Sequence, residues 1–149
     1  MNHQTNNRTA GLLVGILFLL FSLPVGWFTI AHPQVAGGQV PAFLLPTGPV
    51  TVTGLTGKLG FFGIQLPIWL VLALGILSLS FTTTNQRGIT SLPRFALVAT
   101  WMVSAIYVLV AFWLCLFAAD LKLHLGPVLA AVGLGLGLGS GFAAMRRKA

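Results

Sequence analysis

The sequence predicts an all-α integral membrane protein in which four transmembrane helices form one bundle. Apolar residues make up 56% of the 149 residues and charged residues only 6%, with a mean hydropathy of +0.96. Such a composition leaves too little polar surface to cover a water-soluble globule. The apolar residues fall into four runs, and each is close to the roughly 20 residues that cross a hydrocarbon core of about 30 Å. We therefore expect a single transmembrane domain over residues 1–149.

The charge pattern favours a membrane surface over nucleic acid as the partner. The formal net charge is +7 and the sequence pI is about 11.5, values that also occur in nucleic-acid-binding domains. Here the Lys and Arg residues lie in short segments between the apolar runs, where attraction to anionic lipid headgroups explains them. We expect membrane lipids, and no nucleic acid, as partners.

The first apolar run predicts a helix over about residues 10–30, after a polar tail that carries Arg8. Pro24 removes a backbone hydrogen bond, so a kink or an early end is expected there. Trp27 fits the headgroup-level aromatic belt. A cleaved signal peptide is the alternative. The run exceeds the usual apolar length of about 7–15 residues for such a peptide, and no A-x-A-type site follows.

Residues 31–65 form the long connection, which we expect on the outer side of the membrane. The segment PVTVTG alternates β-branched and polar residues, LTGK supplies a turn framed by Gly54 and Gly57, and LGFFGIQ follows. This pattern predicts a β-hairpin lying against the membrane surface. The aromatic residues Phe61 and Phe62 would anchor it in the interface or contact a partner protein.

The second and third runs predict helices over about residues 67–83 and 95–119. Pro67 falls in the first turn, where a helix tolerates proline best, and Trp69 fits an interface position. Pro93 precedes the third run, which is long enough to span with some tilt.

The third helix carries three hydroxyl side chains on one face. Thr100, Ser104 and Tyr107 follow a spacing of four and then three, which aligns them along a helix. They are interpreted as hydrogen-bonding to neighbouring helices or to the preceding turn. The alternative is a polar track for an ion or small solute.

The fourth helix, predicted over about residues 126–145 after a polar DLKLH turn, is rich in glycine. Its glycines alternate as Gly133, Gly135, Gly137, Gly139 and Gly141. On a helix the first, third and fifth share one face, and the other two lie nearly opposite. Small residues let helices approach closely in lipid. One face should pack within the chain, and the second either there or against another copy or another membrane protein.

The alternate glycines resemble the glycine-rich inner helix of rotor-ring subunits of ATP synthases. That family is a two-helix hairpin whose ion-binding carboxylate lies mid-membrane. The third helix here has no mid-membrane carboxylate, so the resemblance implies no shared function and no family is assigned.

The orientation follows from the distribution of Lys and Arg, which are in excess on cytoplasmic flanks. With four spans, one side holds Arg8, Arg87, Arg94, Arg146, Arg147 and Lys148, and the other holds Lys58 and Lys122. We expect both termini in the cytoplasm. The sequence does not indicate which membrane.

Few residues are available for chemistry. Asp120 is the only acidic residue, which excludes mechanisms that need two carboxylates from this chain. Cys115 is the only cysteine and lies in an apolar run, where a thiol behaves as a small hydrophobe. No nucleophile elbow, phosphate loop, dinucleotide fingerprint or zinc-finger spacing occurs. We expect no catalytic, cofactor-binding or metal-binding residues, and no enzyme activity.

An outer-face polar cluster is the remaining candidate site. It consists of His32, Asp120, Lys122 and His124, which share the outer side under the predicted topology. Their spacing matches no ligand pattern. Polar residues at a hydrated interface are therefore favoured over a metal or proton site.

These patterns predict a non-catalytic scaffold or accessory subunit that associates through its glycine-rich helix. The alternative is a small transporter or channel component for an ion or small solute, using the hydroxyl stripe. An integral-membrane enzyme comes third.

Overall fold

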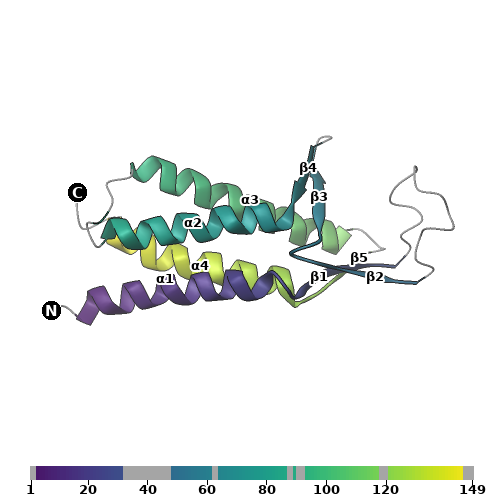
Figure 1. The fold of residues 1–149 in the computed structure, drawn as a ribbon, viewed down its shortest axis with the longest axis horizontal. Coiled ribbons are helices and arrows are strands. Elements are labelled where there is room, and N and C mark those ends of the chain that lie inside the picture. Colours follow the sequence, from purple (N-terminus) through teal and green to yellow (C-terminus); the bar gives the residue numbers. More distant parts are fainter. Residues whose placement is uncertain are drawn as a thin grey trace.

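The computed structural model describes residues 3–31, 48–61, 64–86, 89, 93–117 and 121–145. Within them the chain is mostly helical, with the four helices α1 (His3–Ser22), α2 (Ile68–Gln86), α3 (Arg94–Phe117) and α4 (Leu125–Met145). The helices lie side by side along the long axis of the molecule (Figure 1). The start of α1 and the end of α4 lie at one end of the bundle, and the described strands lie at the other.

The four helices meet around Gly75 of α2. A Cβ atom there would lie 3.3 Å from Leu134 of α4 and from the Ser104 hydroxyl of α3, and 3.4 Å from Leu19 of α1. Leu19, Ser104 and Leu134 are all buried. The missing side chain thus lets one residue from every other helix reach the centre of the bundle.

Two helices are long and apolar enough to cross a membrane, α2 over Ile68–Asn85 and α3 over Phe95–Phe117. The described parts of α1 and α4 hold shorter apolar segments, Thr9–Ser22 and Leu125–Ser140. This measure gives weak support for a membrane protein, because buried core helices of soluble proteins share the same length and composition. It does not support the four spans that the sequence predicts.

The first helix begins and ends earlier than the predicted range of about 10–30. Helix α1 runs from His3 to Ser22, so much of the expected polar tail is helical. The chain leaves the helix just before Pro24, in keeping with the expected early end, and residues Gly26–Ile30 form strand β1. The prediction of helix beyond residue 22 is therefore wrong.

Trp27 explains why the chain leaves the helix at this point. Its side chain is fully buried, and its indole N–H donates a 2.9 Å hydrogen bond to the carbonyl of Ser22. That bond satisfies one of the carbonyls that a helix end leaves without an internal partner. Gly126 in the first turn of α4 lies against the indole, with room for no Cβ atom. Trp27 therefore joins the end of α1 to the start of α4.

Strand β1 is the centre of a three-stranded sheet. It pairs antiparallel with β2 (Val50–Thr53) on one side and with β5 (Leu121–Leu123) on the other. The predicted DLKLH turn is thus partly a strand. The segment of β1 is apolar and contains β-branched residues, and it forms a strand because one partner strand is available on each side. Both partner strands come from parts of the sequence distant from β1.

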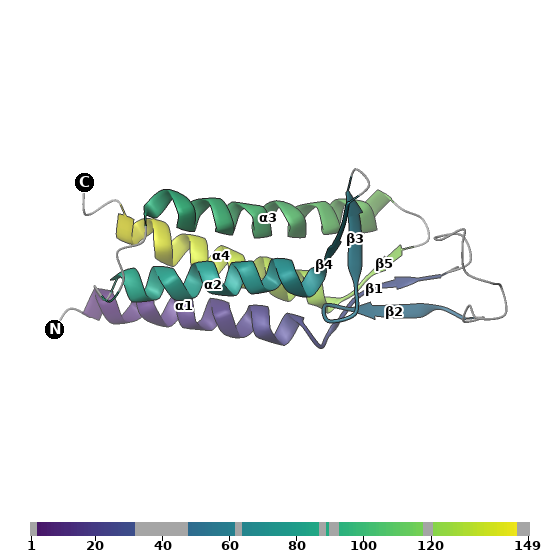
Figure 2. The ribbon, with the colours of Figure 1, turned by 45° about the horizontal axis from the view of Figure 1, so that its top comes forward.

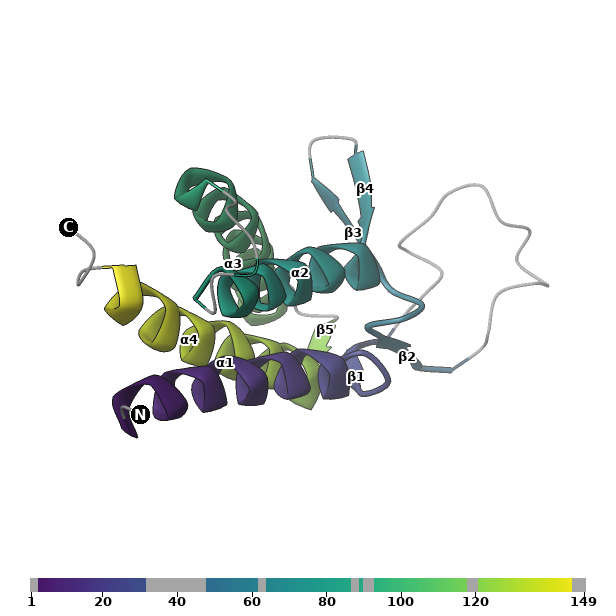
Figure 3. The same ribbon diagram turned by 60° about the vertical axis from the view of Figure 1, so that its left-hand side comes forward.

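The predicted hairpin has different partners. Strand β2 pairs with β1, whereas β3 (Lys58–Phe61) pairs with β4 (Ile64–Pro67) in a separate two-stranded sheet. The turn between β2 and β3 is fixed to the end of α1, because the backbone N–H of Leu55 donates to the carbonyl of Leu23 at 3.1 Å. Strands β3 and β4 consequently leave in another direction, across the helix axis (Figures 2 and 3). Phe62 lies outside the described residues.

Candidate functional site

The candidate site is the pair of glycine faces on α4, and the inner face forms the contact with α1. A Cβ atom on Gly133 would lie 2.7 Å from the carbonyl oxygen of Gly15, and a Cβ atom on Gly15 would lie 2.7 Å from that of Gly133. Real Cβ atoms essentially never come this close to other atoms. The two backbones therefore touch, and neither helix has room for a side chain at the contact.

The same close contact continues along both helices. Any Cβ atom on Gly11 of α1 would overlap the hydroxyl of Ser140, and one on Gly137 would overlap the side chain of Leu79 of α2. The glycines of α1 were not singled out in the sequence analysis. Their signal is present, because Gly11 and Gly15 form a G-x-x-x-G pattern typical of helix-packing faces in membranes.

The second face of α4 has no neighbour among the described residues. No atom lies within 4 Å of a Cβ atom placed on Gly135 or Gly139. Val132 and Leu136 beside them are exposed. Gly141 lies within α4, but its surroundings are outside the described side chains. Two of the five glycines are thus packed inside the bundle and two face outward.

The hydroxyl stripe of α3 faces the other elements of the bundle. Ser104 is fully buried and donates to the carbonyl of Val71 on α2 at 2.9 Å. The Tyr107 hydroxyl donates to the carbonyl of Leu66 on β4 at 2.8 Å. Thr100 donates to its own helix, to the carbonyl of Ala96 at 2.9 Å. These bonds join α3 to α2 and to the β3–β4 hairpin.

The outer-face polar cluster is described only in part. Lys122 and His124 are exposed, in and just after β5, whereas His32 and Asp120 lie outside the described residues. His124 contacts a residue that the sequence analysis did not place beside it. Its Nε2 atom lies 2.6 Å from the hydroxyl of Thr29 on β1.

Within the described part of the chain, no three His, Cys, Asp or Glu side chains come together as metal ligands do. Comparisons with protein-family models, curated proteins and solved structures find no match for this chain.

Proposed function

We propose that this chain is a four-span membrane protein that acts as a non-catalytic scaffold or accessory subunit, associating through the outward glycine face of α4. The four-span placement is supported by large apolar side chains exposed on the outward faces of every helix. These include Leu17 and Phe21 on α1, Trp69 and Leu77 on α2, Ile106, Leu109 and Trp113 on α3, and Val132 and Leu136 on α4. In water such a surface favours aggregation, whereas in lipid it is the expected exterior.

Helix length supports the same placement for α4. This helix has 21 residues, and at a rise of about 1.5 Å per residue it reaches about 32 Å. This is close to a hydrocarbon thickness of about 30 Å. The apolar part of α1, Thr9–Ser22, is shorter, so its placement is supported by its exposed apolar side chains and not by its length.

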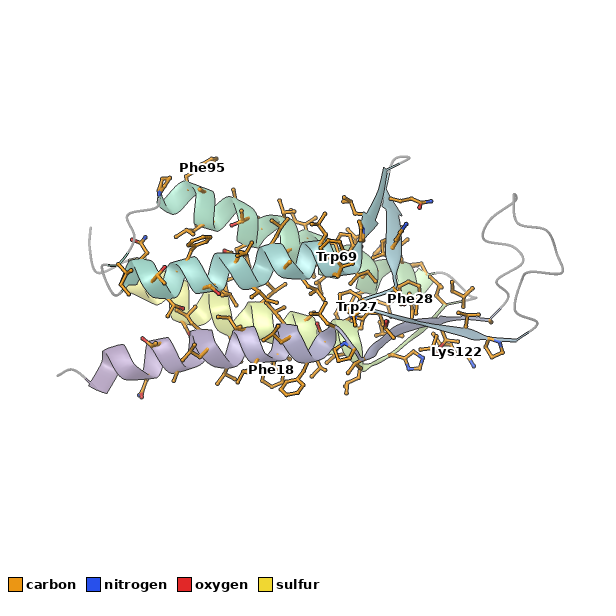
Figure 4. The ribbon with its side chains drawn as sticks, in the orientation of Figure 1. Phe18, Trp27, Phe28, Trp69, Phe95 and Lys122 are labelled. Carbon is orange, nitrogen blue, oxygen red and sulfur yellow. The ribbon has the colours of Figure 1, made fainter. Side chains whose placement is uncertain are left out.

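Aromatic residues support an interface at the end of the bundle that carries the strands. Trp69 lies there, near the start of α2 (Figure 4), and Trp113 packs against Phe117 in the last turns of α3, with ring centroids 5.1 Å apart. All three side chains are exposed. Exposed Trp and Phe at one level match an aromatic belt. With the basic flanks at the opposite end, we propose that the termini are cytoplasmic and the strands lie outside.

The outward face of α4 carries the association proposal. Among the described residues, nothing beyond the helix's own nearby backbone lies within 4 Å of a Cβ atom on Gly135 or Gly139, yet glycine in a helix costs about 1 kcal/mol relative to alanine. The inner glycines are explained by their contacts with α1 and α2. The outer two have no such contact in the part of the chain that the structure describes, and a second membrane helix packed on them would explain their small size.

Cysteine cross-linking in native membranes tests the association. In a Cys115→Ser background, Gly139→Cys should form intermolecular cross-links. The mass of the native protein in mild detergent should show an oligomer, and Gly139→Leu in the native sequence should reduce it to a monomer. Ala96→Leu is the matched control, since it enlarges an exposed small residue on α3. If the cross-linking and the mass measurement both detect only monomers, the proposal is refuted.

Reporter fusions test the placement separately. A fusion in the turn between β2 and β3 should report the outer side, and a fusion at either terminus should report the cytoplasm. A cytoplasmic signal from the turn would exclude the four-span arrangement. The transporter alternative has no observation in its favour, because the hydroxyls of Ser104 and Tyr107 are occupied by backbone carbonyls.

A further inference from the structure

The exposed face of the three-stranded sheet brings four polar side chains together. Thr29 of β1 is paired directly with Thr51 of β2 on one side and with Lys122 of β5 on the other. Directly paired residues project from the same face of a sheet. His124 follows Lys122 by two positions, which places it on that face as well. We call these four residues the sheet face.

Three of the four side chains of the sheet face are linked by short hydrogen bonds. The Thr29 hydroxyl lies 3.0 Å from the Thr51 hydroxyl and 2.6 Å from Nε2 of His124. When Nε2–H donates to Thr29, Thr29 donates to Thr51, and Thr51 keeps its own hydrogen to donate outward. A bound anion would stabilise this order of donors over the reverse one.

Gly26 lies close to two of these residues. A Cβ atom on Gly26 would lie 3.0 Å from the methyl group of Thr51 and 3.6 Å from the ring of His124, so a side chain at this position would crowd both. The polar groups of the sheet face are hydroxyls, an imidazole and the ammonium group of Lys122. The only acidic residue of the sequence, Asp120, lies outside the described residues.

The sheet face continues the lipid-facing side of α1. Val14, Leu17, Phe18 and Phe21 follow the spacing of a single helical face, and three of them are exposed. Figure 4 shows Phe18 and Lys122 on the same side of the molecule, one along the helix and the other beyond its end. An apolar helix face that leads to a cationic, hydroxyl-rich surface is complementary to a lipid with acyl chains and an anionic headgroup.

We propose that the sheet face binds the phosphate group of an anionic phospholipid in the outer leaflet, with the acyl chains along α1. The inference rests on the four-span placement proposed above, but not on association through α4. Lys122 supplies the charge, and the Thr51 hydroxyl donates to a phosphate oxygen, while His124 orders the two hydroxyls by donating its Nε2–H to Thr29. Lipids with the same acyl chains and a zwitterionic headgroup bind more weakly, because their net charge is zero.

Native mass spectrometry of the full chain in a neutral detergent tests the proposal. Phosphatidylglycerol and phosphatidylcholine with identical acyl chains are titrated, and the ratio of their dissociation constants is measured. We expect phosphatidylglycerol to bind about fivefold more tightly, because the attraction of one lysine to an anionic membrane surface corresponds to about this ratio of dissociation constants. Lys122→Gln should bring the ratio close to one. Thr51→Val should weaken the binding of both lipids, because both carry the phosphate group that its hydroxyl contacts.

Lys58→Gln is the matched control, because it removes the same charge at the same end of the molecule but on β3. It should leave the ratio unchanged. An equal loss in Lys58→Gln would show that net charge alone is measured and would refute the site. Displacement of phosphatidylglycerol by excess inorganic phosphate would also refute it, in favour of a free-anion site.

Failure of this inference is distinguishable from failure of the proposed function. An unchanged lipid ratio in Lys122→Gln refutes the lipid site and leaves the Gly139 cross-linking and the reporter fusions unaffected. A cytoplasmic signal from a fusion in the β2–β3 turn would instead refute the placement on which both depend.

Discussion

The two glycine faces of α4 have the same composition and different surroundings. Gly133 and Gly137 are buried against α1 and α2, whereas Gly135 and Gly139 are exposed and have no packing neighbour among the described residues. Composition alone therefore does not distinguish a glycine that the packing of the helices requires from a glycine that faces outward. The difference lies in what a methyl group would meet, so alanine substitutions along this helix should give effects of opposite sign.

The largest effect is expected for Gly133→Ala. The added methyl group would lie 2.7 Å from the carbonyl oxygen of Gly15, and a backbone atom cannot move aside without separating the two helices. Forcing an extra carbon into a packed contact costs about 1–3 kcal/mol, and we expect the upper end here. Unfolding in mixed detergent and SDS micelles measures the free energy. Stability equal to that of the wild type would show that α1 and α4 do not touch at this point.

A smaller loss is expected for Gly137→Ala. Here the methyl group would meet the end of the Leu79 side chain, which can change rotamer more readily than backbone can move. We expect a destabilisation of about 1 kcal/mol. The double variant with Leu79→Val should recover part of it, because the shorter side chain makes room. Additive effects of the two substitutions would contradict the contact.

The smallest effect, and the opposite sign, is expected for Gly135→Ala. No other described element lies within 4 Å of the new methyl group, and alanine is the better helix former by about 1 kcal/mol. The free energy of unfolding of the monomer should therefore rise by up to about 1 kcal/mol. The same unfolding assay, run at a protein concentration where only monomers are present, checks this. A loss of stability would mean that this face is already covered within the chain.

Tyr107→Phe extends the comparison to the β3–β4 hairpin. It removes the hydroxyl that donates to the carbonyl of Leu66 at 2.8 Å and leaves the ring in place. We expect a loss of about 1 kcal/mol, the net contribution of a typical hydrogen bond. Hydrogen exchange should show faster exchange in β3 and β4 and unchanged protection across the α1–α4 contact. Uniform acceleration would contradict a local role.

The four helices were predictable because they are signalled locally. Apolar runs of helical length appear directly in the sequence, and α2, α3 and α4 begin within a residue of the predicted positions. The division of the α4 glycines into two faces also follows from helical geometry. Which of the two faces is packed depends on where α1 lies, and no local pattern in α4 determines that.

The strands were less predictable because their pairing is not local. Residues Gly26–Ile30 are as apolar as the helix before them, and they form a strand because β2 and β5 pair with them from distant parts of the sequence. The contact between Thr29 and His124 depends on the same pairing. The G-x-x-x-G pattern of Gly11 and Gly15, in contrast, was visible in the sequence and was overlooked beside the longer glycine run.

The contacts between α1 and α4 also bear on how the chain is made. Helix α1 packs against α4 and β1 pairs with β5, so the earliest described elements have their partners among the last. Chains are synthesised from the N-terminus, and N-terminal segments generally begin to fold first. Until β5 and α4 have been synthesised, the Gly11 and Gly15 face of α1 lacks its contact with α4, and one edge of β1 lacks its partner strand. During that interval this face of α1 is open to contacts with other helices, and a chain arrested before Leu125 would remain without the α4 contact.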